Sequence, residues 1–131
     1  MSQLNGQSRY NRYYAPTGLM VLRGPRGVPE KGSRWILADD HGYAETIYME
    51  DDKAINPNTF YIENLEIKTQ VRRKGHGRNL YFKVEQFAKN IGAEWIQIDS
   101  ETEALGFWEK MGFNETGREF YGNKINMIKK I

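Results

Sequence analysis

The chain has 131 residues, enough for one domain with a single hydrophobic core. Hydrophobic residues make up 39% of it and charged residues 27%, which is typical of water-soluble globular proteins. Cysteine is absent, so disulfides, thiolate catalysis and cysteine-based metal sites are excluded. The two histidines, His41 and His76, are far apart in the sequence, and we therefore expect a functional site without a metal.

Hydropathy and charge argue against two further classes of protein. No apolar run approaches the roughly 18 residues of a membrane span and no secretory signal pattern opens the chain, so we expect a cytoplasmic protein with no membrane partner. The net charge of +2 comes from 19 basic and 17 acidic residues, a balance that argues against a dedicated nucleic-acid-binding domain. The basic cluster of residues 72–74 with Arg78 keeps nucleic-acid binding open as an alternative.

The first 30 residues differ in composition from the rest. Several arginines precede the first acid, Glu30, and the segment is rich in Gly, Pro, Asn and Gln with tyrosines between them. We interpret residues 1–30 as an extended arm that packs against its own domain or against a partner, and residues 31–131 as the domain. In the second case, a homo-oligomer or a larger assembly would form through this arm.

In chain order, the first predicted elements are strands. Thr17–Arg23 is a short strand, and residues 24–29 contain too much Gly and Pro to form the interior of a helix. Ser33–Ala38 and Tyr43–Glu50 are predicted to form an antiparallel hairpin. Residues 51–58 are polar and include a proline, which indicates a loop.

A strand–helix–strand–helix order follows. The predicted strand Phe60–Lys68 has Ile67 as its last apolar residue. After a basic turn, apolar residues recur on one face of a predicted helix that runs to Ile91. Trp95–Ile98 has the length of a strand, and Glu103–Met111 is helical.

The chain ends in a predicted hairpin, whose strands Phe113–Tyr121 and Lys124–Ile128 turn at Gly122 and Asn123. The complete order predicts an α/β (α+β) fold. We expect a mixed, mostly antiparallel sheet with helices packed against it and a central strand–loop–helix site.

Residues 72–78 join the central strand to the N-terminus of the long helix. Gly75 and Gly77 lack Cβ atoms, so an anion can approach their backbone closely. The first N–H groups of a helix have no intrahelical partner, and the helix dipole favours negative charge there. The sequence therefore predicts a site for a phosphate-like anion at this turn.

Two segments of the chain resemble motifs of the GNAT superfamily of acetyl-CoA-dependent N-acetyltransferases. Residues 67–77 (IKTQVRRKGHG) fit the family's strand end followed by Arg/Gln-x-x-Gly-x-Gly/Ala. Residues 104–113 (ALGFWEKMGF) resemble its Ala-x-x-Phe-Tyr-x-Lys-x-Gly-Phe segment. The resemblance covers residues 33–128 and implies a compact GNAT-like fold that moves the acetyl group of acetyl-CoA to a primary amine of a small molecule or a protein.

The resemblance also implies roles for the matched positions. Backbone groups near Leu65, Glu66 and Ile67 would pair with the pantetheine arm of acetyl-CoA as an additional strand does. Backbone amides of residues 72–78 would hold its pyrophosphate, and their cationic side chains would add charge. Phe107 would flank the thioester. The implied cofactor-binding set is Leu65, Glu66, Ile67, Arg72, Arg73, Lys74, Gly75, His76, Gly77, Arg78 and Phe107.

The sequence departs from the family pattern in two places. The family's two helices between its first and second strands have no room in residues 24–32, so the acceptor site is either open or completed by the N-terminal arm or a partner. Trp108 stands where many relatives carry a tyrosine thought to protonate the leaving thiolate, and an indole cannot serve as that acid. Water or another tyrosine would have to replace it, or the chain is a GNAT-fold structural or assembly protein with little or no turnover.

Amine acetylation also needs a group that accepts the amine proton, and a carboxylate suits this role. Glu63 is the first candidate because strand alternation places it on one face with Tyr61, Leu65 and Ile67, where it would be partly desolvated. The alternative is that Glu63 is exposed or pairs with a cation of a neighbouring strand. Glu66 is the second candidate, since a bulge in the strand would reverse the side of the sheet on which the following side chains lie.

Two other groups leave alternatives open. Histidine is suited to acid–base chemistry near neutral pH, but the place of His76 between two glycines of the turn favours a loop residue that binds through its backbone N–H. Asp99, Ser100 and Glu101 end a strand, where they either contact substrate or cap the next helix.

Overall fold

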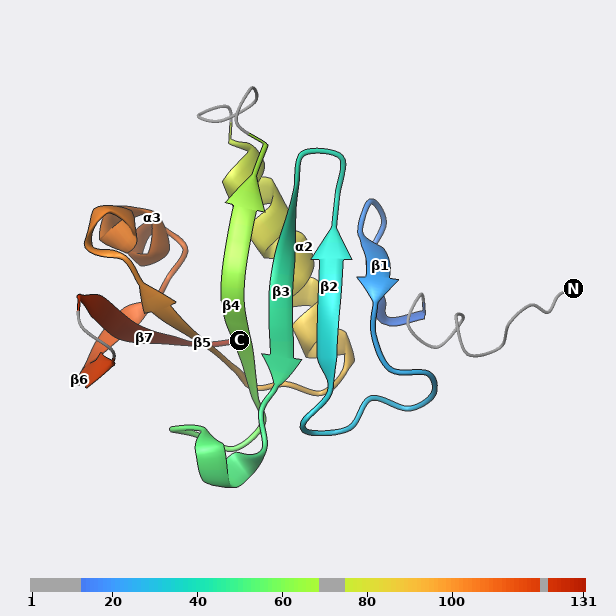
Figure 1. Cartoon of the computed structure of the whole chain (residues 1–131), viewed down its shortest axis with the longest axis horizontal. Coiled ribbons are helices and arrows are strands. Elements are labelled where there is room, and N and C mark those ends of the chain that lie inside the picture. The colour runs from blue at the N-terminus through green and yellow to red at the C-terminus, as the bar shows by residue number, and fades with distance from the viewer. Residues whose placement is uncertain (1–12, 69–74, 121–122) are drawn as a thin grey trace, which may run out of the picture.

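The computed structural model describes residues 13–68, 75–120 and 123–131 (Figure 1), with the backbone only for residues 118–120. Arg72, Arg73 and Lys74 of the predicted site, the first twelve residues of the predicted arm and the turn residue Gly122 lie outside these ranges. Within the described residues the chain forms one seven-stranded sheet in the order β1-β2-β3-β4-β5-β7-β6.

The described elements follow the predicted order. The strands are β1 (Met20–Arg23), β2 (Arg34–Ala38), β3 (Gly42–Tyr48), β4 (Thr59–Ile67), β5 (Trp95–Ser100), β6 (Asn114–Phe120) and β7 (Lys124–Lys130). The helices are α2 (His76–Asn90) and α3 (Leu105–Lys110), with short 3-10 turns η1 (Asp51–Lys53) and η3 (Thr102–Ala104). Neighbouring strands are antiparallel except β4 and β5, which are parallel. The predicted mixed, mostly antiparallel sheet is confirmed.

Most predicted elements differ from the structure by one or two residues at their ends, and three differ more clearly. Strand β1 is shorter than predicted because Gly18 has a φ of 86° and the Leu19 N–H bonds the Pro16 carbonyl, which makes a turn of the residues before Met20. The predicted helix Glu103–Met111 is divided into η3 and α3. The predicted loop 51–58 contains the single turn η1.

Both helices pack on the same face of the sheet. Phe87 of α2 lies 5.4 Å from the Trp35 ring and 6.0 Å from the Phe60 ring, measured between centroids. The Tyr81 ring of α2 contacts Trp108 of α3 at 5.8 Å. The core therefore lies between the sheet and these helices, as Figure 1 shows for α2 behind β2, β3 and β4. We call this side the helix face; among the described residues, no helix covers the opposite side of β1–β4, which we call the bare face.

The side chains of β4 change face at a β-bulge. The pairing of β3 with β4 runs from Thr46↔Ile62 to Glu45↔Asn64, so the register shifts by one residue around Glu63. Leu65 and Ile67 consequently pack against the core on the helix face. The prediction that Glu63 shares a face with Leu65 and Ile67 is therefore wrong, because the bulge interrupts strand alternation.

The parallel strands β4 and β5 form a fork. Their ladder begins at Thr59↔Trp95 and ends at Ile62↔Ile98. Beyond that point β4 continues along β3 as far as Ile67, whereas β5 continues along β7 as far as Ser100. Two strands that take different partners diverge, and this places an opening in the sheet between the second half of β4 and α3.

The described part of the predicted arm lies against its own domain. Strand β1 pairs antiparallel with β2, and the Asn90 side chain at the end of α2 donates a hydrogen bond to the Tyr14 carbonyl at 2.8 Å. The boundary between arm and domain after residue 30 stays a prediction. None of the helices in the described ranges is both long and apolar enough to cross a membrane.

Candidate functional site

The fork opens onto a pocket of about 580 Å³ at the N-terminus of α2. Predicted cofactor residues from three elements line it: Ile67 from β4, Gly75, Gly77 and Arg78 from the start of α2, and Phe107 from α3. These residues span forty positions of the sequence, and the crossover from β4 through α2 to β5 and α3 brings them together. The structure thus joins the two sequence motifs around one cavity.

The glycines of this pocket have distinct structural roles. Gly75 is the N-cap residue of α2 with a φ of 80°, a left-handed conformation that costs glycine little, and its carbonyl accepts the first helical bond from the Asn79 N–H at 3.1 Å. At Gly77 a Cβ would lie 3.4 Å from the Phe107 ring and 3.7 Å from Ile67. The small side chain of Gly77 therefore keeps the pocket open between β4 and α3.

The helix start also meets the requirements of an anion site. Its first N–H groups lack intrahelical acceptors, and no side chain caps them. There is no acidic residue in the first turn. Arg78 lies on the pocket wall, with its guanidinium 5.9 Å from the Phe82 ring. Backbone dipole and side-chain charge therefore both favour a negatively charged ligand.

His76 occupies a different position from the glycines beside it. Its ring stacks on His41 of the β2–β3 turn with centroids 3.6 Å apart, and its buried Nδ1 has no hydrogen-bond partner among the described residues. The contact fixes the β2–β3 turn against the start of α2. The side chain of His76 does not line the pocket, in keeping with its interpretation as a residue that binds through its backbone.

Two pocket residues were missed by the sequence analysis, Lys110 and Met111 of the second motif. Lys110 lies three positions after Phe107, so helical periodicity places both on one side of α3. This three-residue spacing from Phe107 could have indicated from the sequence that Lys110 lines the pocket. A lysine at the pocket adds a second described cation to Arg78.

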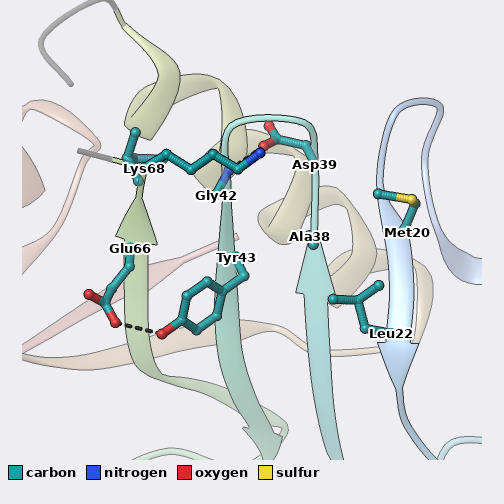
Figure 2. Close-up of a pocket in the computed structure, with 9 residues that line it drawn as sticks. Met20, Leu22, Ala38, Asp39, Gly42, Tyr43, Glu66 and Lys68 are labelled. Atoms are coloured by element: carbon teal, nitrogen blue, oxygen red, sulfur yellow. Dashed lines mark hydrogen bonds between the residues drawn. The ribbon is translucent and has the colours of Figure 1, made fainter. Parts of the chain in front are cut away.

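A second pocket of about 470 Å³ lies on the bare face (Figure 2). Its apolar wall includes Met20 and Leu22, which are 49% and 61% exposed. Its polar side includes Tyr43 and Glu66, whose side chains point toward each other in Figure 2. An exposed apolar wall beside a carboxylate suits a ligand with both an apolar and a cationic part.

Glu66 is held by a hydrogen-bonded network on this face. Its Oε2 accepts bonds from the Tyr43 hydroxyl at 2.6 Å and from the Asn64 side-chain amide at 2.9 Å. The same amide donates to Glu45 at 3.2 Å. The hydrogen bond to Glu66, together with burial and the neighbouring carboxylates, raises the pKa of Tyr43 above its usual value. The predicted reversal at a bulge is confirmed, since Glu66 lies on the bare face whereas Leu65 and Ile67 pack against the core.

Glu63 lies at the bulge and pairs with Arg34 of β2, whose guanidinium donates to its Oε1. Its side chain is 36% exposed, so the predicted desolvation on an apolar face is wrong: the bulge brings it to a cation and to solvent. Arg34 and Glu63 line a smaller hollow of about 160 Å³ on the bare face. Glu63 therefore pairs with a cation of a neighbouring strand, which was the alternative expectation for this residue.

A further network spans the base of the fork. The Tyr61 hydroxyl donates to Asp99 Oδ2 at 2.5 Å, and the Asn126 amide donates to Asp99 Oδ1 at 2.9 Å. Ser100 donates instead to the Glu101 carbonyl, and η3 begins without a side-chain cap. The predicted capping role of this strand end is therefore not found. The proximity of Tyr61 to Asp99 had no signal in the sequence, because it depends on which strands are neighbours.

The described residues contain no group of three or more His, Asp or Glu side chains that could hold a metal ion. The site thus combines a helix N-terminus with cations, a fork in the sheet, and carboxylates and tyrosines on the bare face. This arrangement can bind an elongated anion from one side and present a cationic or neutral amine from the other.

Comparison with known proteins identifies the family. A family model described as "Acetyltransferase (GNAT) domain" matches residues 30–129. The chain belongs to the GNAT acetyltransferase family. The match includes both motifs and every described residue of the pocket at α2.

Solved GNAT structures have the same fold. A putative N-acetyltransferase from Lactobacillus plantarum aligns with a TM-score of 0.61 at 19% identity, covering 75% of this chain and 68% of that chain. PaiA N-acetyltransferase from Thermoplasma acidophilum, in complex with coenzyme A, aligns with a TM-score of 0.58 at 20% identity over 75% and 60% of the two chains. A Bacillus subtilis acetyltransferase in complex with CoA gives 0.59 at 18% identity over 77% and 78%.

A curated relative is similar over a shorter stretch. L-ornithine N5-acetyltransferase NATA1 from Arabidopsis thaliana is 41% identical over 56 residues, which are 40% of this chain and 25% of that protein. The chain therefore spans about a quarter of the length of this relative.

Proposed function

We propose that the protein is an N-acetyltransferase that moves the acetyl group of acetyl-CoA to a primary amine. The observation that carries the proposal is the pocket that joins the start of α2, the end of β4 and Phe107 of α3. Family membership and CoA-bound relatives of the same fold support it. We propose a cytoplasmic location and leave the acceptor open between small amines and proteins.

The residues of the pocket and of β4 suit the successive parts of acetyl-CoA, from its pyrophosphate to its thioester. The amides of Gly75, His76, Gly77 and Arg78 would hold the pyrophosphate, with the cations Arg78 and Lys110 beside them. The cations of residues 72–74 would add to this charge. Backbone groups of β4 near Leu65, Glu66 and Ile67 would pair with the pantetheine arm. Bound in this way, acetyl-CoA would present its activated thioester in the fork, with Phe107 beside the cofactor.

The acceptor amine would arrive from the bare face. Glu63 and Glu66 both lie there and are two candidate proton acceptors, Glu63 beside the fork and Glu66 in the pocket of Figure 2. Because the pocket is open, its apolar wall would hold the body of the acceptor and its carboxylate would attract an ammonium group. The amine nitrogen forms a bond to the acetyl carbon, the carbon–sulfur bond breaks, and the protein contributes positioning and proton transfer.

Acetyl-CoA binding and turnover together test the proposal. Binding is measured by calorimetry, and turnover by thiol release with a panel of L-ornithine, spermidine and a lysine peptide. L-ornithine is included because of the relative that acetylates it. The chain has no cysteine, so every thiol detected comes from CoA. We expect micromolar binding and amine-dependent thiol release.

A charged substitution at the helix start gives the matched test. Gly77→Asp places a carboxylate in the pocket and is expected to weaken acetyl-CoA binding at least 100-fold, about 2.7 kcal/mol. Gln86→Glu makes the same change of charge on an exposed position of α2 away from the pocket and should leave the affinity unchanged. Equal affinity of all three proteins would contradict the assigned pocket.

The assembly alternative gives a different result. A protein that binds acetyl-CoA with Gly77-dependent affinity but releases no thiol with any amine would be a GNAT-fold binding or assembly module. A larger complex formed through the N-terminal arm, measured by light scattering, would support that role.

A further inference from the structure

Tyr61 of β4 and Asp99 of β5 form a hydrogen-bonded pair outside the pockets described above. Asp99 is half-buried and accepts one hydrogen bond on each oxygen, from Tyr61 at 2.5 Å and from Asn126 at 2.9 Å. Asn126 is completely buried, and its own Oδ1 accepts a bond from Thr116 at 2.8 Å. Asn126 also donates to the Ile98 carbonyl at 3.3 Å. The orientation of Asp99 is therefore set by residues of β4, β6 and β7.

The pair lies at the base of the fork. Tyr61 is opposite Gln97 in the β4–β5 ladder, but its hydroxyl reaches Asp99, one residue beyond the last ladder pair Ile62↔Ile98. Phe60 and Ile62 pack in the core, so the alternating Tyr61 side chain belongs to the bare face. The hydroxyl is therefore where the two strands separate, on the side from which an acceptor would arrive.

The position matches the expected end of the cofactor. From Ile67 at the pyrophosphate pocket back to Glu63 at the bulge, β4 advances by four residue steps, roughly 13 Å at 3.3 Å per residue. A pantetheine arm that follows β4 from that pocket brings its thioester toward the base of the fork. This step depends on the proposed function.

We propose that the Tyr61 hydroxyl binds the acceptor amine and relays its proton to Asp99. Because the hydroxyl donates its hydrogen to a carboxylate, its oxygen becomes a stronger acceptor for an amine N–H. Tyr61 would contact the substrate and is the catalytic residue of the pair. Asp99 acts through Tyr61 and is a positioning residue that also receives the proton.

The protons of the reaction balance without a separate acid. An ammonium acceptor passes one proton through the Tyr61 oxygen as the hydroxyl hydrogen moves to Asp99, which leaves a neutral amine. The amine nitrogen then bonds to the acetyl carbon, the carbon–sulfur bond breaks, and the second nitrogen proton ends on the CoA sulfur. Asp99 later returns its proton to solvent. No tyrosine at position 108 is needed.

The two glutamates are placed less favourably for this step. Glu63 is bonded to the Arg34 guanidinium, and Glu66 is bonded to Tyr43 and Asn64 near the pyrophosphate end of β4. The Tyr61–Asp99 hydrogen bond joins β4 to β5 one residue beyond their last ladder pair, Ile62↔Ile98. We therefore expect the pair, rather than either glutamate, to dominate the rate.

Three substitutions test the relay in the full chain, with the amine that the wild-type protein acetylates best in the panel above. Tyr61→Phe removes only the hydroxyl and should lower kcat/KM for the amine about 100-fold or more. Asp99→Asn keeps Tyr61 in place, so it should lower kcat similarly with little change in the KM of the amine. The affinity for acetyl-CoA should stay within about twofold of the wild-type value in both variants. Glu63→Gln should reduce kcat less than tenfold.

Tyr81→Phe is the matched control. It removes a tyrosine hydroxyl that donates to a carboxylate, Glu85, at 2.7 Å on the helix face, and kcat per folded molecule should stay at the wild-type level. Melting temperatures separate folding losses from catalytic ones; if Tyr61→Phe does not fold, Asp99→Asn alone decides. Wild-type kcat in either fork variant overturns the relay while leaving the acetyltransferase proposal intact. Absence of turnover in the wild-type protein overturns both.

Discussion

The helix face and the bare face of this sheet use their side chains in opposite ways. On the helix face, Trp35, Phe60 and Phe87 meet ring to ring and are completely or almost completely buried. On the bare face, Met20 and Leu22 are substantially exposed beside charged networks. Stability comes from the first face, and the second is available for ligands because no helix of the described residues covers β1–β4 on that side.

The difference between the faces also appears in their ion pairs. Glu85 on the helix face is 9% exposed and bonds to Tyr81 at 2.7 Å and to Lys129 at 2.5 Å. The Arg34–Glu63 pair on the bare face joins two side chains that are 65% and 36% exposed. A buried, hydrogen-bonded pair constrains the fold, whereas an exposed pair contributes little to it. The comparison leads to three predictions of decreasing size.

The largest effect is expected from removing a ring on the helix face. Phe87→Ala should lower the free energy of unfolding by about 3–5 kcal/mol, because it leaves a cavity against Trp35 and Phe60. Leu22→Ala on the bare face should cost less than about 1 kcal/mol, since Leu22 is 61% exposed. Urea denaturation measures both, and equal losses would show that the bare face is covered in solution.

A smaller effect is expected at the buried pair. Glu85→Gln should cost about 1–3 kcal/mol, because Lys129 would lose its charged partner in a half-buried position. Burial opposes ionisation of Glu85, but the bonds from Lys129 and Tyr81 outweigh it and hold the pKa of the carboxyl below its usual value. Its contribution is therefore complete above the unfolded-state pKa and is lost as the pH falls through the lower folded-state pKa.

This pH dependence has its own measurement. Wild-type stability should decrease between about pH 5 and pH 2 more steeply than that of Glu85→Gln, followed by urea denaturation at each pH. Parallel curves for the two proteins would mean that Glu85 has the same proton affinity folded and unfolded.

The smallest effect is expected at the exposed pair. Arg34→Gln should change the free energy of unfolding by less than about 1 kcal/mol, since both partners remain in contact with water. A double-mutant cycle with Glu63→Gln isolates the interaction. A coupling above 2 kcal/mol would place this pair among the structural elements of the fold and weaken the contrast between the two faces.

Much of the fold followed from local patterns. Apolar residues spaced as in a helix predicted α2, whose buried side includes Leu80, Val84 and Phe87. The glycines at its start and the second motif at Phe107 predicted the cofactor pocket, and the structure gathers their described residues around one cavity. These features depend on residues close in sequence or on a known motif.

The side chains of the bare face could not be predicted in the same way. Strand alternation placed Glu63 with Leu65 and Ile67, but one extra residue at the bulge changed the face of every side chain after it. No short-range pattern marks such a bulge, because it is set by the pairing of β4 with β3. The contact of Glu63 with Arg34 likewise depends on β2, β3 and β4 being neighbours.

The amino-acid order alone thus determined the helices and most of the strands, and it predicted an anion site at the start of α2, because the causes of these features act over a few residues. Only the tertiary structure decided which carboxylates lie on the bare face and that Tyr61 meets Asp99 across the fork. Those contacts join residues far apart in the chain, and they exist only after the sheet has chosen its strand order and register.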